Sequence, residues 1–186
     1  MPRHEDVAVW AAQQAKTSSP GVVFVRRKAK AEQLAAAIEN VLGEPVPWVT
    51  SDVPQHKRDA YVEQLRSGKT AVAVATSAWS TGLDIPELRW VAFADEGKAP
   101  IWVTQAAVRG SRVAEGKTEF EVFDLQCKDS AVRREHLSDY IEDTDALEQV
   151  QLARKASDNY NNTDSTEPRY WLMGLILMLS FWVTCH

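Results

Sequence analysis

Short runs of apolar residues alternate with helical patterns along the first two thirds of the chain, and this alternation restricts the possible folds. A run such as Val22-Val23-Phe24-Val25 is apolar at every position, as expected of a strand buried on both faces. Helices between successive strands imply crossover connections, and therefore an α/β fold with a parallel sheet and helices on both faces. Strands are predicted at 22–25, 46–49, 71–75, 90–94 and 120–125, and helices at 6–15, 29–42 and from about 52 to 66.

Capping residues mark the ends of the predicted helices. Gly43 follows the second helix where a C-cap glycine belongs. Ser51 or Asp52 is expected to cap the third helix, with Pro54 in its first turn, and Ser67-Gly68 is expected to end it.

Composition and charge divide the 186 residues into a body and a tail. Residues 1–134 hold 18 Lys and Arg against 17 Asp and Glu, whereas residues 135–186 hold 3 against 9. We expect one domain over 1–140, an acidic helical extension and polar linker over 141–169, and an apolar segment over 170–186. A near-neutral body neither supports nor excludes a nucleic-acid partner, because it can still present a local basic strip.

The cysteines and histidines predict no metal site. Cys127 and Cys185 are far apart, and the four histidines show no ligand spacing with them. No signal peptide opens the sequence, so a cytoplasmic protein is expected.

The tail ends in an unusual run. Residues 170–183 contain no charged side chain, yet fourteen residues are fewer than the roughly 20 that a spanning helix needs, so a membrane partner is not expected. The run could be a membrane-surface anchor, a docking helix for a partner, an out-of-frame extension or a buried terminal helix. The abrupt change in composition favours a docking helix or an out-of-frame run.

Gly68-Lys69-Thr70 resembles the end of a Walker A phosphate loop, but the pattern fails. It requires a glycine where this chain has Glu63, and the loop must follow a strand and open a helix. Here a helix precedes and a strand follows, so the tripeptide is interpreted as a turn.

Polar residues follow the third predicted strand at the position where parallel sheets bind ligands. Thr76 and Ser77 come directly after the strand, and Gly82 and Asp84 follow shortly after. Because ligands lie outside the carboxyl ends of parallel strands, these side chains are candidates for contact with a polar ligand. Alternatively, Thr76 and Ser77 cap a helix and Asp84 begins a turn.

A third cluster combines an amide and two guanidinium groups. Gln105, Arg109 and Arg112 are spaced by four and three residues, which places them on one face of a helix. Paired arginines suit a phosphate group, since each guanidinium is a planar, permanently charged fork. The alternative is a solvated face or a set of salt-bridge partners.

The order of these blocks resembles the C-terminal RecA-like domain of superfamily 2 helicases, and most closely the XPB-like and UvsW-like DNA helicases. Val22–Val25 is similar to motif IV, Ala75–Pro86 to motif V, and Gln105–Arg112 to motif VI. The similarity covers about residues 5–140. Motif VI departs from its usual form, since Ala106 and Val108 stand where an arginine and a glycine are usual.

The resemblance implies a role for each candidate residue. Arg109 and Arg112 would act as arginine fingers on the γ-phosphate of ATP, with Gln105 beside them in the catalytic motif. Gly82 and Asp84 would contact ATP. Nucleic-acid phosphates would be held by the three hydroxyl-bearing residues Ser51, Thr76 and Ser77.

The same resemblance implies a missing half. The sequence has no Walker A motif and no acidic motif for magnesium, so ATP and Mg²⁺ would bind only with an N-terminal RecA-like half, on another chain or lost by truncation. The expected function is the C-terminal half of an ATP-dependent helicase on single-stranded or branched nucleic acid, DNA by resemblance. Such a protein works in the cytoplasm, the nucleoid or a viral replication context. The alternatives are a non-catalytic module that binds nucleic acid or a helicase partner, and a truncated relic.

Overall fold

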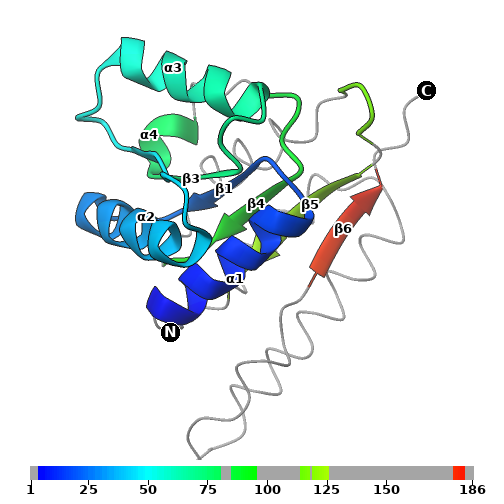
Figure 1. Cartoon of the computed structure of the whole chain (residues 1–186), viewed down its shortest axis with the longest axis horizontal. Helices are drawn as coiled ribbons and strands as arrows, with labels where there is room; N and C mark the ends of the chain where they lie inside the picture. Colours follow the sequence, from blue (N-terminus) through cyan, green and yellow to red (C-terminus); the bar gives the residue numbers. More distant parts are fainter. Residues whose placement is uncertain (1–3, 81–84, 96–113, 118, 126–177, 183–186) are drawn as a thin grey trace, which may run out of the picture.

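A computed structural model describes residues 4–80, 85–95, 114–117, 119–125 and 178–182. It contains a sheet in the order β2-β3-β1-β4-β5-β6 (Figure 1). The first five strands of that order pair in parallel, as the sequence predicts. The strands are β1 (Gly21–Phe24), β2 (Trp48–Val49), β3 (Val72–Ala75), β4 (Trp90–Phe93), β5 (Glu119–Asp124) and β6 (Met178–Trp182).

Helices cover both faces of this sheet. The helices α1 (His4–Thr17) and α2 (Lys28–Leu42) lie on one face, and α3 (Gln55–Arg66) and the short α4 (Ser77–Ser80) lie on the other (Figure 1). The predicted α/β architecture with helices on both faces is therefore confirmed. The domain boundaries predicted near residues 140 and 169, and the predicted helical and polar tail between them, lie outside the described residues.

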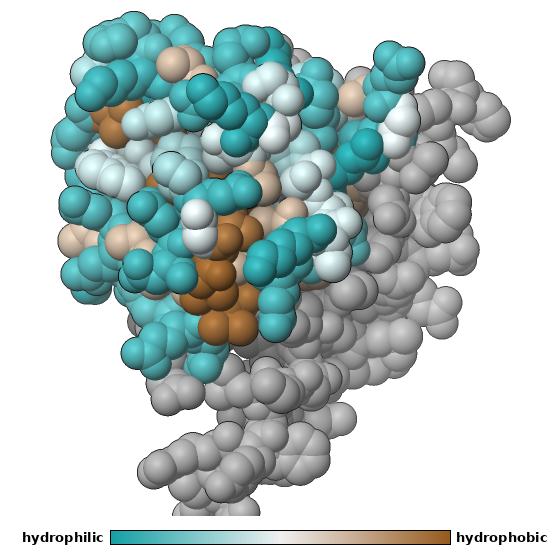
Figure 2. Space-filling view, in the orientation of Figure 1, coloured by the Kyte–Doolittle hydropathy of each residue, from teal (hydrophilic) through white to brown (hydrophobic). Residues whose placement is uncertain are grey.

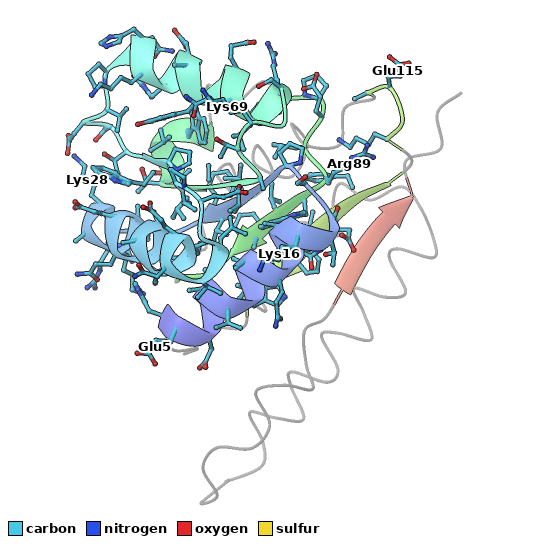
Figure 3. All side chains as sticks on the ribbon, in the orientation of Figure 1. Glu5, Lys16, Lys28, Lys69, Arg89 and Glu115 are labelled. Carbon is cyan, nitrogen blue, oxygen red and sulfur yellow. The ribbon has the colours of Figure 1, made fainter. Side chains whose placement is uncertain are left out.

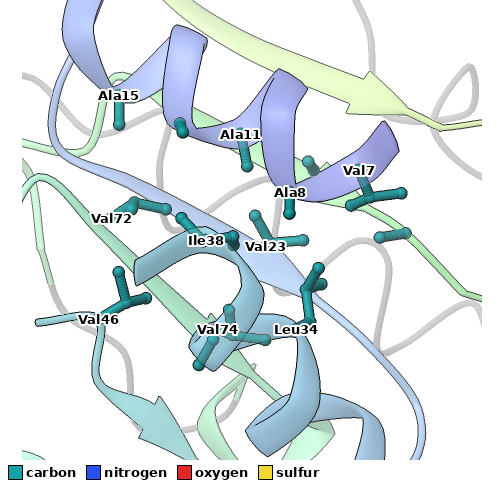
Figure 4. Close-up of a cluster of buried hydrophobic side chains, with 14 of the residues drawn as sticks. Val7, Ala8, Ala11, Ala15, Val23, Leu34, Ile38, Val46, Val72 and Val74 are labelled. Carbon is teal, nitrogen blue, oxygen red and sulfur yellow. The ribbon is translucent and has the colours of Figure 1, made fainter. Parts of the chain in front are cut away.

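The core on the α1 and α2 face forms because small side chains repeat at helical spacing. Ala8, Ala11 and Ala15 of α1 are buried and point toward α2 and the sheet (Figure 4). Leu34 and Ile38 of α2 complete the layer, both no more than 1% exposed. A side-chain period of three and four residues puts these positions on one helical face, so the sequence itself orients both helices against the strands.

The surface over the same two helices is mostly polar, with a small apolar patch between them (Figure 2). Among the described residues, Val9 on α1 and Val41 on α2 are the large hydrophobic side chains that remain exposed. No helix within the described residues is long and apolar enough to cross a membrane.

The predicted N-terminal cap of the third helix is wrong. The N-cap of α3 is Pro54, without a side-chain cap bond, rather than Ser51 or Asp52. Residues 50–53 instead form their own turn, in which the Val53 amide donates to the Thr50 carbonyl at 3.2 Å. This turn uses the polar residues that would otherwise cap the helix.

The end of the chain also differs from one of the expectations. Residues 178–182 form β6, which pairs antiparallel with β5, and not a buried terminal helix. An edge strand presents unpaired backbone N–H and C=O groups, and β6 satisfies those of β5. The rest of the apolar run lies outside the described residues.

At the amino edge of the sheet, where the parallel strands begin, side chains pack against or hydrogen-bond to the backbone of neighbouring segments. Gly21 starts β1 directly against the indole of Trp90, and a Cβ added to Gly21 would lie 1.9 Å from Trp90 Cε2. The Trp90 Nε1 donates to the Ser18 carbonyl at 2.6 Å. Arg89 donates through Nη1 to the Gly116 carbonyl at 2.9 Å. These contacts join the beginnings of β1, β4 and β5.

Lys117 belongs to the same edge. Its Nζ donates to the Pro86 carbonyl at 2.9 Å and lies 4.9 Å from the centre of the Phe120 ring. Burial, and then the nearby charge of Arg89, lower the pKa of Lys117 to about 8, while Glu87 acts in the opposite direction. The amino edge is therefore packed around a half-buried ammonium group.

Candidate functional site at the carboxyl edge of the sheet

The carboxyl ends of the parallel strands meet at one edge. Phe24, the last residue of β1, is level with Ala75 of β3 and Phe93 of β4, and Val49 of β2 is also level with Ala75. The residues that follow each strand are therefore neighbours at this edge. Open parallel sheets bind their ligands at such an edge, as expected from the sequence.

Three exposed cationic residues follow β1, and we call Arg26, Arg27 and Lys28 the basic turn. Arg27 is the N-cap residue of α2, with extended backbone and no side-chain cap bond, and Lys28 is the first residue of the helix. Figure 3 shows Lys28 at this edge of the molecule and Arg89 at the opposite one. The turn thus places positive charge in solvent where a ligand would approach, beside the positive end of the α2 dipole.

A buried carboxylate contacts the first residue of the basic turn and a lysine in the first turn of α2. Asp95 follows β4 and is 4% exposed. Its Oδ2 accepts from the Arg26 amide at 3.3 Å, and its Oδ1 accepts from Lys30 Nζ at 2.9 Å. Asp95 therefore joins the end of β4 to the beginning of α2.

A second carboxylate meets the basic turn from the β2 side. Lys28 Nζ lies 2.6 Å from Asp52 Oδ1 and 2.7 Å from Oδ2. The hydrogen bond from Lys28 is the largest of the influences that hold the pKa of Asp52 below its ordinary value. Ser51, one of the predicted phosphate contacts, is exposed beside it, with Oγ 3.5 Å from Asp52 Oδ1.

Thr76 and Ser77 lie at the end of β3, between β2 and β1. Thr76 is buried, and its hydroxyl donates to the Val49 carbonyl at 3.4 Å. The Thr76 carbonyl accepts from the Trp79 amide at 3.0 Å where α4 begins, which fits the alternative interpretation as a helix start. Ser77 is exposed at the same edge. The structure therefore brings Ser51, Thr76 and Ser77 to one edge, and their contact with phosphate stays a prediction.

The remaining predicted site residues lie outside the described residues: Gly82, Asp84, Gln105, Arg109 and Arg112. Ile85, which follows Asp84, is fully buried. The roles of these five residues stay predictions.

Sequence reasoning missed Asp95, Lys30 and the basic turn. A usable signal existed, because Arg26 and Asp95 each come directly after a predicted buried strand, the same position that singled out Thr76. The ion pairs themselves depend on which strands become neighbours, and the sequence alone does not specify that.

The fold and this edge define a RecA-like α/β domain. The C-terminal domain of the DEAD-box protein Dbp5 has a similar structure, with a TM-score of 0.61 and 19% identity, covering 82% of this chain and 90% of that structure. Lhr of Mycobacterium smegmatis, solved with ssDNA and AMP-PNP, gives a TM-score of 0.57 at 16% identity, covering 82% of this chain and 19% of that one. At these identities the likeness shows the fold.

The model of the helicase conserved C-terminal domain matches residues 6–114, more than half of the chain, and the chain belongs to this family. "Putative helicase 22" of Sulfolobus islandicus filamentous virus (isolate Iceland/Hveragerdi) is 36% identical over 107 residues, 57% of this chain and 19% of that protein. The ATP-dependent RNA helicase RhlB of Vibrio vulnificus is 30% identical over 124 residues, 66% of this chain and 27% of that protein.

These relatives define the family without resolving a branch within superfamily 2, because DEAD-box and Lhr proteins both match. The chain spans about a fifth to a quarter of the length of the curated relatives.

Proposed function

We propose that this chain is the C-terminal half of an ATP-dependent helicase or translocase that acts on DNA. The observation that carries the proposal is the exposed basic turn at the carboxyl edge of a helicase-family domain. Phosphate contacts supply most of the affinity of proteins for nucleic-acid strands, and Lys and Arg side chains make them. Ser51, Thr76 and Ser77 at the same edge add hydroxyl groups suited to phosphate oxygens.

The chemical step is assigned to residues between the described segments. Arg109 and Arg112 would contact the γ-phosphate and stabilise the charge of the phosphoryl-transfer transition state, with Gln105 beside them. Gly82 and Asp84 would contact the nucleotide. Family membership supports these assignments, since the family match includes all five positions.

ATP and Mg²⁺ would require an N-terminal RecA-like half with its own phosphate loop. Gly68-Lys69-Thr70 is not such a loop, because it lies in the turn between the end of α3 at Arg66 and the start of β3 at Val72. ATP would bind between the two halves, and closing and opening of the pair would move the strand contacts along the nucleic acid.

The preference for DNA rests on the resemblance to UvsW-like helicases, and the Lhr structure contains ssDNA. RNA is the competing substrate, because RhlB is named as an RNA helicase. A direct comparison of the two strands therefore belongs in the test.

The test measures ATP hydrolysis stimulated by single-stranded DNA or RNA. The samples are the full chain, an N-terminal RecA-like half, and their mixture. We expect activity only in the mixture, stimulated more by DNA, and a loss of about a thousandfold or more with Arg112→Ala. Lys69→Ala is the control, since it removes an exposed cation from the turn that resembles a phosphate loop and should leave activity unchanged.

A different result would change the function. Strand binding by the folded chain without hydrolysis in any mixture would favour a non-catalytic binding module. A chain that neither binds strands nor unfolds cooperatively would be interpreted as a relic.

A further inference from the structure

Two carboxylates contact the basic turn, and their surroundings differ. Asp95 contacts the start of the turn through the Arg26 amide, and it contacts Lys30, just beyond the turn, through Nζ. The side chains of Asp95 and Lys30 are 5% and 24% exposed. The carboxylate is therefore buried and the lysine only partly exposed, so a ligand in solvent has little access to the Asp95 end of the pair.

The second carboxylate is open to solvent. The side chains of Lys28 and Asp52 are 53% and 69% exposed. Exposed ion pairs contribute little to stability, because water and salt screen them and the side chains lose entropy on pairing. A phosphate group could therefore replace Asp52 at Lys28 at small cost to the fold.

We propose that the two carboxylates have opposite effects on the affinity of the basic turn for nucleic-acid phosphate: Asp95 raises it and Asp52 lowers it. Asp95 is a positioning residue that holds the turn in its exposed arrangement, and Asp52 competes with phosphate for Lys28. This inference rests on the proposed function, since it names residues that regulate the strand contact. The ligand is the phosphate backbone of single-stranded DNA.

The inference is testable because it predicts that neutralising the two carboxylates changes phosphate affinity in opposite directions, whereas total charge alone predicts the same direction for both. Asp95→Asn and Asp52→Asn each remove one negative charge from the same edge, so total charge alone would strengthen phosphate binding in both. Asparagine at 95 can still accept from the Arg26 amide, but it leaves the Lys30 ammonium without its anionic partner. The first turn of α2, which follows the basic turn, would then lose the ion pair that connects it to Asp95.

The experiment measures binding of a fluorescent oligothymidylate to the full chain by polarisation, over a series of salt concentrations. The variants are Asp52→Asn, Asp95→Asn and Arg27→Ala. Glu44→Gln is the matched control, because Glu44 is exposed and lies beyond the far end of α2, roughly 20 Å along the helix from the basic turn.

The two carboxylate variants are expected to change the affinity for the oligonucleotide in opposite directions. Asp52→Asn binds up to about fivefold more tightly than the wild type, and its affinity falls more steeply with salt, by roughly 0.7 in the logarithmic slope, because one more phosphate contact forms. Asp95→Asn binds at least about threefold more weakly while it still unfolds cooperatively. Arg27→Ala reduces both affinity and slope, and Glu44→Gln changes neither.

Several outcomes would overturn the inference. Tighter binding by Asp95→Asn, or an Asp52→Asn affinity equal to that of Glu44→Gln, would show that the carboxylates act only through total charge. If Asp95→Asn does not fold, the affinity of Asp52→Asn compared with that of Glu44→Gln decides whether the inference holds. Binding that Arg27→Ala alone weakens would overturn the inference and leave the proposed strand contact intact, whereas binding that no variant alters, or no binding by any form, would overturn both.

Discussion

The two edges of the sheet hold positive charge in different ways. At the amino edge, Arg89 and Lys117 donate to backbone carbonyls of neighbouring connections, and Lys117 also lies over an aromatic ring. At the carboxyl edge, Lys28 and Lys30 pair with carboxylates, while Arg26 and Arg27 stay exposed. The cations of the amino edge thus join parts of the fold, whereas those of the basic turn face solvent.

This difference separates stability from ligand binding within one sheet. The bond from Lys117 to the Pro86 carbonyl is partly buried, so its loss would leave polar atoms short of a partner, which costs about 1–3 kcal/mol. An exposed ion pair exchanges partners at much lower cost. Substitutions at the amino edge should therefore change mainly the free energy of unfolding, and those at the carboxyl edge mainly the affinity for phosphate.

The largest effect is expected from Gly21→Ala at the amino edge. The new methyl group would lie 1.9 Å from Trp90 Cε2, and Trp90 is fully buried. Because neither the strand nor the indole can move without disturbing the core, we expect a loss of at least about 3 kcal/mol in the free energy of unfolding. Urea denaturation followed by circular dichroism measures it.

Gly43→Ala is the matched control for that substitution. Gly43 has a φ of 81° and no atom within 4 Å of an added Cβ, so it tests backbone strain alone. A cost of about 1–2 kcal/mol is expected. Equal costs at the two glycines would show that contact with Trp90 is not what excludes a side chain from position 21.

Trp90→Phe should have the next largest effect. It removes the hydrogen bond to the Ser18 carbonyl and leaves space beside Trp10 and Phe123, whose rings meet Trp90 edge-on. We expect a loss of about 2 kcal/mol in the free energy of unfolding, against a smaller loss for Trp48→Phe on the half-buried edge strand. If Gly21 and Trp90 are coupled, Gly21→Ala should cost less in the Trp90→Phe background.

The order of the elements was predictable because burial leaves a direct trace in sequence. Every position of β1, β3 and β4 is buried. Each strand coincides, to within one residue, with an apolar run that was predicted as a strand. Gly43 was also predictable, since its φ of 81° favours glycine. The start of α3 was not, because residues 50–53 form a turn with their own polar groups.

The candidate site was predictable only in part. The rule about carboxyl ends of strands located Thr76 and Ser77 correctly at the edge, and it applies equally to Arg26 and Asp95. The contact of Asp95 with Lys30 joins residues 65 positions apart. Such pairs depend on the register of β1 against β4, so residue patterns do not reveal them.

Thr76→Val tests the carboxyl edge with a smaller expected effect on stability. The hydroxyl bond to the Val49 carbonyl is long at 3.4 Å, and that carbonyl also accepts from the Thr76 amide at 2.9 Å. We therefore expect a loss of less than about 1 kcal/mol in the free energy of unfolding. Affinity for single-stranded DNA should fall if the predicted phosphate contact exists, and unchanged affinity would assign Thr76 to the fold alone.

The last effect is a change in stability with pH, and it concerns Lys117 at the amino edge. Its pKa falls from the ordinary 10.5 to about 8 in the folded protein. Between these pH values the unfolded chain holds a proton that the folded protein has released, so the contribution of Lys117 to the free energy of unfolding rises as pH increases from about 8 to 10.5. Below pH 8 both states are protonated, and the folded state carries the cost of a half-buried charge.

Lys117→Met should remove this rise. The measurement is the difference between the unfolding free energies of wild type and variant at several pH values across the window. Lys16→Met is the control for loss of a lysine, because Lys16 is exposed on α1. Subtracting the curves cancels the other groups that titrate there. A difference that does not change with pH would mean that the Pro86 carbonyl and the Phe120 ring stabilise the ammonium enough to offset its burial, and that the amino edge holds a permanent charge.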